Sequence, residues 1–113
     1  MNVIMSVKLK NAINKAYGKP LEFKLSNISV NGDKRGCSGF VKNPENGVVV
    51  YVNTEKSVLK SLGYLVRYAR DFKDYTGTRN RNDHFSLEDI VEEVCEMLNR
   101  EEEWKHELVA WKR

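Results

Sequence analysis

Residues 43–52 read NPENGVVVYV, a turn signal followed directly by a run of apolar and aromatic side chains. Proline presets one backbone dihedral, and Asn-Gly supplies the positive φ that a tight reversal needs. Branched and aromatic residues favour a strand, and this run is apolar enough for a central place in a sheet. The stretch therefore predicts a reversal into a buried strand over residues 48–53.

Two further strands are predicted upstream of this reversal. Residues 21–25 alternate apolar and charged side chains, which is typical of a strand with one buried face. The alternation resumes up to residue 30 after an out-of-phase Ser26-Asn27, which predicts a bulge or kink there. Residues 31–33 read Asn-Gly-Asp, a turn signal, and residues 36–42 form the next predicted strand. Tight turns between consecutive strands indicate an antiparallel meander.

Helical periodicity predicts the remaining elements. Apolar side chains recur at helical spacing in residues 6–17 and again in residues 57–73, which we expect to be the main helix. A polar loop follows over residues 75–83. Ser86 is a candidate N-cap for the next helix, because Asp89 stands three residues later as in a capping box. A last helical segment follows, either continuous with that helix or broken near Asn99.

The predicted fold is a single α+β domain over residues 1–113, in the order α-β-β-β-α-α. A three-stranded antiparallel sheet carries helices on one face, and residues from about 86 to 113 form a C-terminal helical extension. With 113 residues, 41% of them hydrophobic, the chain buries about two thirds of its unfolded surface. That size leaves little room for a deep reaction cavity.

Composition also predicts a soluble protein of the cytoplasm. The longest apolar runs fall far short of the roughly 20 residues that a membrane span needs, so no membrane association is expected. The N-terminus shows no charged region followed by an apolar region and a cleavage site. Two cysteines are too few for a disulfide framework.

Charge is distributed unevenly along the chain. Residues 1–81 hold fifteen Lys and Arg against six Asp and Glu, a net charge of +9. Residues 82–113 hold four Lys and Arg against ten Asp and Glu, a net charge of −6. A basic body with an acidic C-terminal segment predicts one surface that attracts phosphate and another that attracts basic partners, unless the two simply neutralise each other.

Residues for catalysis are sparse. The two histidines, His84 and His106, stand on different predicted elements, and neither belongs to a nucleophile motif. Cys37 is best explained as a small residue inside the sheet, and Cys95 as part of a helix core. Phosphate loops, dinucleotide fingerprints and metal-ligand spacings are absent from the sequence. We expect no enzyme activity, no cofactor and no metal site.

A basic surface with interleaved aromatic residues is the first candidate site. Guanidinium and ammonium groups neutralise phosphates, and aromatic rings stack on bases, so this surface predicts binding to nucleic acid or to a partner. It comprises Arg67, Arg70, Lys73, Arg79 and Arg81, together with Tyr64 and Tyr75.

An acidic and aromatic helical segment is the second candidate site. Carboxylates in a row can take the place of phosphates, and tryptophans are common anchors of protein interfaces. The residues are Glu92, Glu93, Glu96, Trp104 and Trp111. The two tryptophans can equally pack on the protein's own core or on a second copy, so a homodimer is open and the oligomeric state is undetermined by the sequence.

Residues 35–55 and 68–77 resemble a pattern in small uncharacterised proteins of phages and mobile elements of Gram-positive bacteria. The resemblance implies a host bacterial cell as the setting, and it carries over no catalytic residue. Phage proteins without an active site often inhibit host defence nucleases stoichiometrically, the anti-CRISPR proteins among them. Two hypotheses follow. One is a protein-binding inhibitor of a host nuclease or effector complex; the other is a small accessory protein that binds DNA or RNA.

Overall fold

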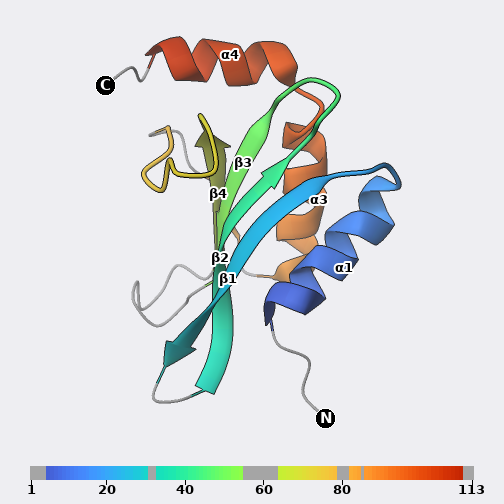
Figure 1. Cartoon of the computed structure of the whole chain (residues 1–113), viewed down its shortest axis with the longest axis vertical. Coiled ribbons are helices and arrows are strands. Elements are labelled where there is room, and N and C mark those ends of the chain that lie inside the picture. Colours follow the sequence, from blue (N-terminus) through green and yellow to red (C-terminus); the bar gives the residue numbers. More distant parts are fainter. Residues whose placement is uncertain (1–4, 31–32, 55–63, 79–81, 85, 111–113) are drawn as a thin grey trace.

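The computed structural model describes residues 5–30, 33–54, 64–78, 82–84 and 86–110. These residues form one α+β unit with a single antiparallel sheet (Figure 1). Its elements in chain order are α1 (Met5–Tyr17), β1 (Glu22–Val30), β2 (Asp33–Lys42), β3 (Val49–Asn53), β4 (Tyr64–Ala69), β5 (Asn82–His84), α3 (Leu87–Met97) and α4 (Glu101–Ala110). Strands adjacent in sequence are also adjacent in the sheet, so the strand order is β1-β2-β3-β4-β5.

The first helix and the first three strands form where the sequence predicts them. In α1, Leu9 and Ile13 at i and i+4 are fully buried. The β2–β3 reversal is closed by a hydrogen bond from the Gly47 amide to the Asn43 carbonyl (2.8 Å). The register irregularity between β1 and β2 lies at Ile28/Ser29, next to the predicted kink at residues 26–27 rather than in it.

The predicted main helix over residues 57–73 is wrong. Residues 55–63 lie outside the described residues, residues 64–69 form strand β4, and residues 70–78 form a succession of turns. In β4, Val66 and Tyr68 enter the core beneath the helices, whereas Leu65 and Ala69 enter a second core on the opposite face. A strand that is buried on both faces loses the alternation of a half-buried strand, and its apolar run also fits a helical period.

The predicted three-stranded sheet and the order α-β-β-β-α-α are therefore corrected. A fourth strand of six residues and a short fifth strand of three residues separate β3 from the C-terminal helices. Helix α3 begins as predicted, because the Ser86 hydroxyl accepts a hydrogen bond from the Asp89 amide (3.1 Å). Of the two alternatives for the last helical segment, the structure has the break, because α3 ends at Met97 and α4 begins at Glu101.

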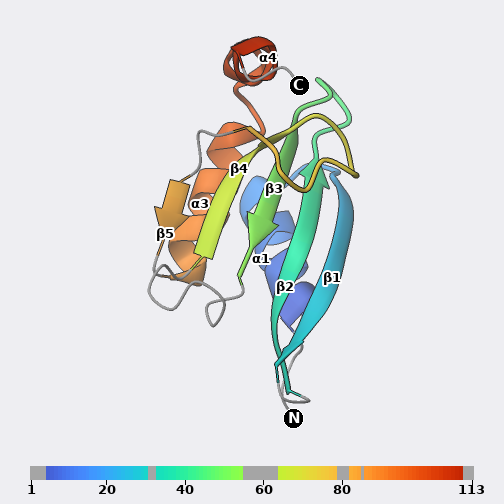
Figure 2. The same cartoon turned by 90° about the vertical axis from the view of Figure 1, so that its left-hand side faces the viewer.

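The sheet is covered differently on its two faces. Figure 1 shows α1 and α3 side by side on one face, with residues 70–78, which we call the strap, against the other. Helix α4 lies across one end of the sheet, and Figure 2 shows the same end from the sheet's flat side. None of the described helices is long and apolar enough to cross a membrane.

Candidate functional site

A groove lies between α1 and α3 on the helix-covered face of the sheet. It has a volume of about 480 Å³ and is lined by Ala12 and Ala16 from α1 and by Leu87, Glu88, Val91, Glu92, Cys95 and Glu96 from α3. Small side chains on α1 leave the space open, and Leu87, Val91 and Cys95 give it an apolar floor. We call this hollow the α1–α3 groove.

A row of glutamates forms the rim of the α1–α3 groove. Glu88, Glu92 and Glu96 follow one another at i, i+4 and i+8, so they lie on one side of α3 and all three are exposed. Asp89 and Glu93 extend the negative charge round the helix, where a second, smaller hollow is lined by Asp89, Glu92, Glu93 and Glu96. Helix α3 contains five carboxylates and no Lys or Arg.

This arrangement is unfavourable for the isolated helix. Like charges at i and i+4 destabilise a helix by about 0.2–0.5 kcal/mol per pair, and the row contains two such pairs. Arg100 pairs with Glu96 (3.2 Å), whereas Glu88 and Glu92 make no ion pair within the described part of the chain. Glu88 gains from its place in the first helical turn, but Glu92 lies too far along for that benefit. The glutamates of the rim therefore repel one another electrostatically, next to an apolar groove.

The two thiols of the described core are not activated nucleophiles. Burial raises the pKa of Cys37, and burial together with the nearby Glu96 charge raises the pKa of Cys95. Both thiols therefore stay protonated at neutral pH. Among the described residues, no group of three His, Cys, Asp or Glu side chains is placed to hold a metal ion.

The strap covers the other face of the sheet through aromatic and hydrogen-bonded contacts. The ring of Phe40 on β2 packs against Phe72 (5.8 Å between ring centroids) and against Tyr75 (4.9 Å). The buried Asp74 carboxylate accepts hydrogen bonds from the amides of Arg70 (2.9 Å) and Gly77 (3.1 Å). These contacts fold the strap back onto the sheet.

Two cations from distant strands hold the strap. Lys24 on β1 donates to the Phe72 carbonyl (2.9 Å) and lies 5.7 Å from the ring centre of Tyr75. Arg67 on β4 donates to the Tyr75 carbonyl (2.9 Å) and lies over the Tyr51 ring (5.1 Å). Lys24 and Arg67 lie on the same face of the sheet and approach the strap from two strands that do not pair with each other. We call the surface formed by Lys24, Arg67, Lys73 and Tyr75 the strap face.

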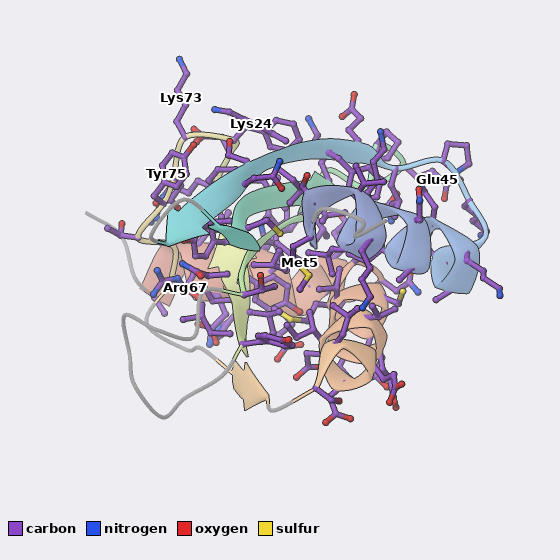
Figure 3. All side chains as sticks on the ribbon, turned by 90° about the horizontal axis from the view of Figure 1, so that it is seen from below. Met5, Lys24, Glu45, Arg67, Lys73 and Tyr75 are labelled. Carbon is purple, nitrogen blue, oxygen red and sulfur yellow. The ribbon has the colours of Figure 1, made fainter. Side chains whose placement is uncertain are left out.

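The structure divides the predicted basic surface. Figure 3 shows Arg67, Lys73 and Tyr75 on the same side of the molecule as Lys24. Arg70 instead bonds the Leu108 carbonyl of α4 (2.9 Å) and pairs with Asp74, and Tyr64 packs against the core beneath α1 and α3. The prediction placed these residues on one side of a helix. Because residues 64–69 form a strand instead, alternate side chains point to opposite faces of the sheet, and Tyr64 and Arg67 lie on different faces. Arg79 and Arg81 lie outside the described residues.

The structure also separates the predicted acidic and aromatic segment. Glu92, Glu93 and Glu96 stay together on α3, but Trp104 is docked on the protein's own body. Its indole N–H donates to the Ala69 carbonyl (2.8 Å), and its ring packs against the main core. The nearby Tyr68 hydroxyl donates to the Glu103 carboxylate (3.0 Å). Trp104 therefore secures α4 to β4. Trp111 lies outside the described residues.

The sequence analysis did not identify the small side chains of α1 or Lys24 as parts of these sites. Ala12 and Ala16 open the α1–α3 groove, and their four-residue spacing on a short helix was the available signal. Lys24 joins the strap face although it lies 43 residues before Arg67 in the chain, and only the strand order brings the two together. No protein-family model, curated protein or solved structure matches this chain.

Proposed function

We propose that this chain is a small non-enzymatic binding protein that acts by stoichiometric association with a basic partner protein through the α1–α3 groove. The observation that carries the proposal is the juxtaposition of an apolar floor with a row of three exposed glutamates. A helix with an apolar stripe bordered by Lys and Arg complements both features. This is the helix-in-groove mode of recognition, with charge fixing the orientation.

The unfavourable charge pattern supports a binding role for the rim. Glu88, Glu92 and Glu96 repel one another in the free protein, and a cationic partner relieves that repulsion. Stability alone would favour alternating charges along α3. The apolar floor next to them, formed by Leu87, Val91 and Cys95, gains from burial at the same time. Both contributions reach their full size only in a complex.

The class of partner that we propose is a nuclease or effector complex with a basic nucleic-acid-binding groove. A Lys- and Arg-bearing helix from the nucleic-acid-binding site of this partner docks in the α1–α3 groove, and the carboxylates of α3 take the place of phosphates, so nucleic acid is excluded from the nuclease. The resemblance of residues 35–55 and 68–77 to phage proteins supports an inhibitor of host defence, of the anti-CRISPR type. In this role the chain needs no chemistry of its own.

A pair of synthetic helical peptides tests the groove. Both have about 18 residues, or five helical turns, and the same leucine stripe, but one carries Lys and the other Glu on its flanks. We expect the Lys peptide to bind the full chain with one-to-one stoichiometry in a calorimetric titration, and the Glu peptide not to bind. Equal binding of the two peptides, or binding of neither, would contradict the proposal.

Matched variants assign the binding to the α1–α3 groove. Glu88→Lys/Glu92→Lys reverses the rim, and Ala16→Trp fills the groove from the exposed side of α1. We expect each to weaken the Lys peptide by about tenfold or more, which corresponds to about 1.4 kcal/mol. Glu102→Lys on α4 and Asn14→Trp on α1 are the controls, because both residues are exposed and lie outside the groove. Controls that weaken binding as much as the groove variants would exclude this site.

The inhibitor role is tested in Gram-positive hosts that carry active CRISPR systems of different types. Expression of the chain is expected to raise the plating efficiency of a targeted phage in at least one host. The Glu88→Lys/Glu92→Lys variant should lose this protection while Glu102→Lys keeps it. Unchanged plating efficiency in every host would remove the inhibitor role and leave the binding groove standing.

A further inference from the structure

The strap face carries a positive charge that the proposed groove does not use. Its cations are Lys24 on β1, Arg67 on β4 and Lys73 in the strap, and by strand register the half-buried Lys42 on β2 faces the same way. Two exposed carboxylates accompany them, while the third, Asp74, is buried in the strap and paired with Arg70. Glu22 shares the face of Lys24 and Lys42, and Asp71 accepts a hydrogen bond from the Lys73 amide (2.8 Å). Apart from the Arg70–Asp74 pair, cations outnumber anions by four to two among these described groups.

An aromatic ring lies between the cations. Tyr75 exposes 48% of its surface, although its ring packs edge-on against Phe40 (64° between the planes) and against Tyr51 (79°). Those contacts hold the ring at a fixed angle on a rigid, buried base. An exposed aromatic residue that is already immobilised loses little conformational entropy when a second ring stacks on it.

The cations near Tyr75 are also fixed in place. Lys24 and Arg67 are each tied to a strap carbonyl, at 2.9 Å in both cases, and they approach from strands three strand spacings apart. That separation is about 14 Å between the strand backbones, but both side chains reach the strap, at carbonyls only three residues apart. Several cations gathered around one short segment can contact more than one phosphate of a strand. Lys73 extends the row into solvent next to Lys24 (Figure 3).

Single strands fit this surface better than a duplex does. Reading a duplex requires an element that enters a groove, such as a helix or a β-ribbon, whereas the strap face presents a sheet with a short loop. An unpaired base can stack on Tyr75 while neighbouring phosphates contact the cations. Sheet surfaces with exposed aromatic residues recognise single-stranded nucleic acid in this way.

We propose that the strap face binds single-stranded nucleic acid, with a base stacked on Tyr75 and phosphates on Lys24, Arg67 and Lys73. The strap face and the α1–α3 groove lie on opposite faces of the sheet, so both can be occupied at once (Figure 1). The chain then joins a basic protein to a nucleic-acid strand. This binding is independent of the proposed inhibition.

Fluorescence anisotropy with labelled oligonucleotides tests this site on the full chain. The probes are oligo(dT), oligo(U) and a mixed-sequence DNA duplex of equal length. We expect both single strands to bind more tightly than the duplex at low salt, and a log–log salt slope of about −2 for three phosphate contacts. A preference between oligo(dT) and oligo(U) identifies DNA or RNA as the ligand. Absence of single-strand binding at low salt, or tighter binding of the duplex, would overturn the proposal.

Variants separate the stacking ring from the charges. Tyr75→Leu keeps an apolar side chain on Phe40 but removes the stacking surface, so we expect a roughly 5- to 150-fold loss of affinity with an unchanged salt slope. Tyr75→Phe restores a ring and should recover most of that affinity. Lys73→Gln should reduce the salt slope by about 0.7. The thermal midpoint of each variant shows whether the strap remains folded.

The double variant Lys24→Gln/Lys73→Gln removes two positive charges from the strap face, and its control removes two positive charges from the opposite face of the sheet. Lys8→Gln/Lys15→Gln changes two exposed residues of α1 and should leave single-strand affinity within about twofold. A loss in this control as large as that in Lys24→Gln/Lys73→Gln would mean that overall charge, and not the strap face, binds the strand. Equal affinities of Tyr75→Leu and Tyr75→Phe would likewise overturn the stacking role.

Discussion

The two faces of the sheet reach the same degree of burial by different means. On the helix-covered face, regular amphipathic helices bring fully buried side chains such as Leu9, Ile13, Ile90 and Val94 onto the strands. On the other face of the sheet, the nine residues of the strap, which have no regular structure, cover Phe40, Val49 and Tyr51. The strap is held by aromatic stacking and by backbone amides that donate hydrogen bonds to the Asp74 carboxylate. An irregular segment can therefore form a core when its backbone groups find partners within the segment and on the sheet.

The largest expected loss of stability comes from the cluster of buried side chains beneath the strap. Phe40→Ala should lower the free energy of unfolding by about 3–5 kcal/mol, because Phe40 is fully buried and contacts three aromatic rings. Leu9→Ala on the helix-covered face should cost about 2–5 kcal/mol. Urea denaturation of both variants measures the two values. A cost below about 1 kcal/mol for Phe40→Ala would show that the strap packs loosely.

Two glycines with positive φ differ in how closely their surroundings are packed. Gly77 in the strap and Gly18 after α1 both have positive φ, 57° and 74°. A Cβ at Gly77 would lie 2.7 Å from the Tyr68 carbonyl oxygen, whereas a Cβ at Gly18 meets nothing within 4 Å. Gly18→Ala should cost about 1–2 kcal/mol from backbone strain alone. Gly77→Ala should cost clearly more, and equal melting midpoints for the two variants would refute the close packing of the strap.

Removing the cap of α3 should have a smaller effect. The Ser86 hydroxyl accepts from the Asp89 amide, and Ser86→Ala should reduce the stability by about 1 kcal/mol. Ser86→Asp keeps an acceptor at the helix N-terminus and should retain the stability. The strap face has no comparable helix end, so single-strand binding should not change in either variant. Thermal melts and anisotropy measure the two properties separately.

The smallest predicted effect is the pH dependence of the stability contributed by Tyr68, which lies on the helix-covered face. Burial and the hydrogen bond to Glu103 raise the pKa of Tyr68 above its ordinary value. The folded state then holds the phenol proton more tightly than the unfolded state, so this stability is fully present below about pH 10 and decreases as the pH rises further. At about pH 10.5 we expect Tyr68 to contribute less than about 1 kcal/mol of the loss relative to pH 8, and the buried thiols of Cys37 and Cys95 to add to that loss. Tyr68→Phe should show a smaller loss in urea titrations, and an equal loss would contradict the assignment.

The difference between the two covers also explains which parts of the fold the sequence predicts. Helices α1, α3 and α4 bury one stripe each, and β1 to β3 are punctuated by turn residues, so their patterns identify them. In β4, Leu65, Val66 and Ala69 are all buried, because both faces of the strand are covered. The sequence of β4 has apolar or aromatic residues on both faces, interrupted by Arg67, and therefore does not alternate, and the strap that covers one face has no periodicity of its own.

The two candidate sites differ in the same way: one follows from spacing along a helix, and the other depends on the arrangement of the sheet. Glu92 and Glu96 stand on one side of a helix, and their spacing alone predicts an acidic row. The pairing of Lys24 with Arg67 across Tyr75 depends on tertiary structure, because the two cations belong to strands that never pair with each other. The sequence groups Arg67 and Tyr75 on a helix and its following loop, and the structure joins them from β4 and the strap. Because β4 is a strand, Tyr64 faces the other side of the sheet, and Arg70, which follows the strand, contacts α4.

The packing of α1 against α3 has a consequence for synthesis on the ribosome. Each strand pairs with its neighbour in the chain, but α1 ends at Tyr17 and α3 begins about 70 residues later, at Leu87. At roughly 5–20 residues per second, that interval lasts about 4 to 14 seconds. During this time the apolar stripe of Leu9 and Ile13 has no α3 to cover it. Strands β1 and β2 can cover part of this stripe early, but the side of α1 that packs on α3 stays open to chaperones until residues 87–97 emerge from the exit tunnel.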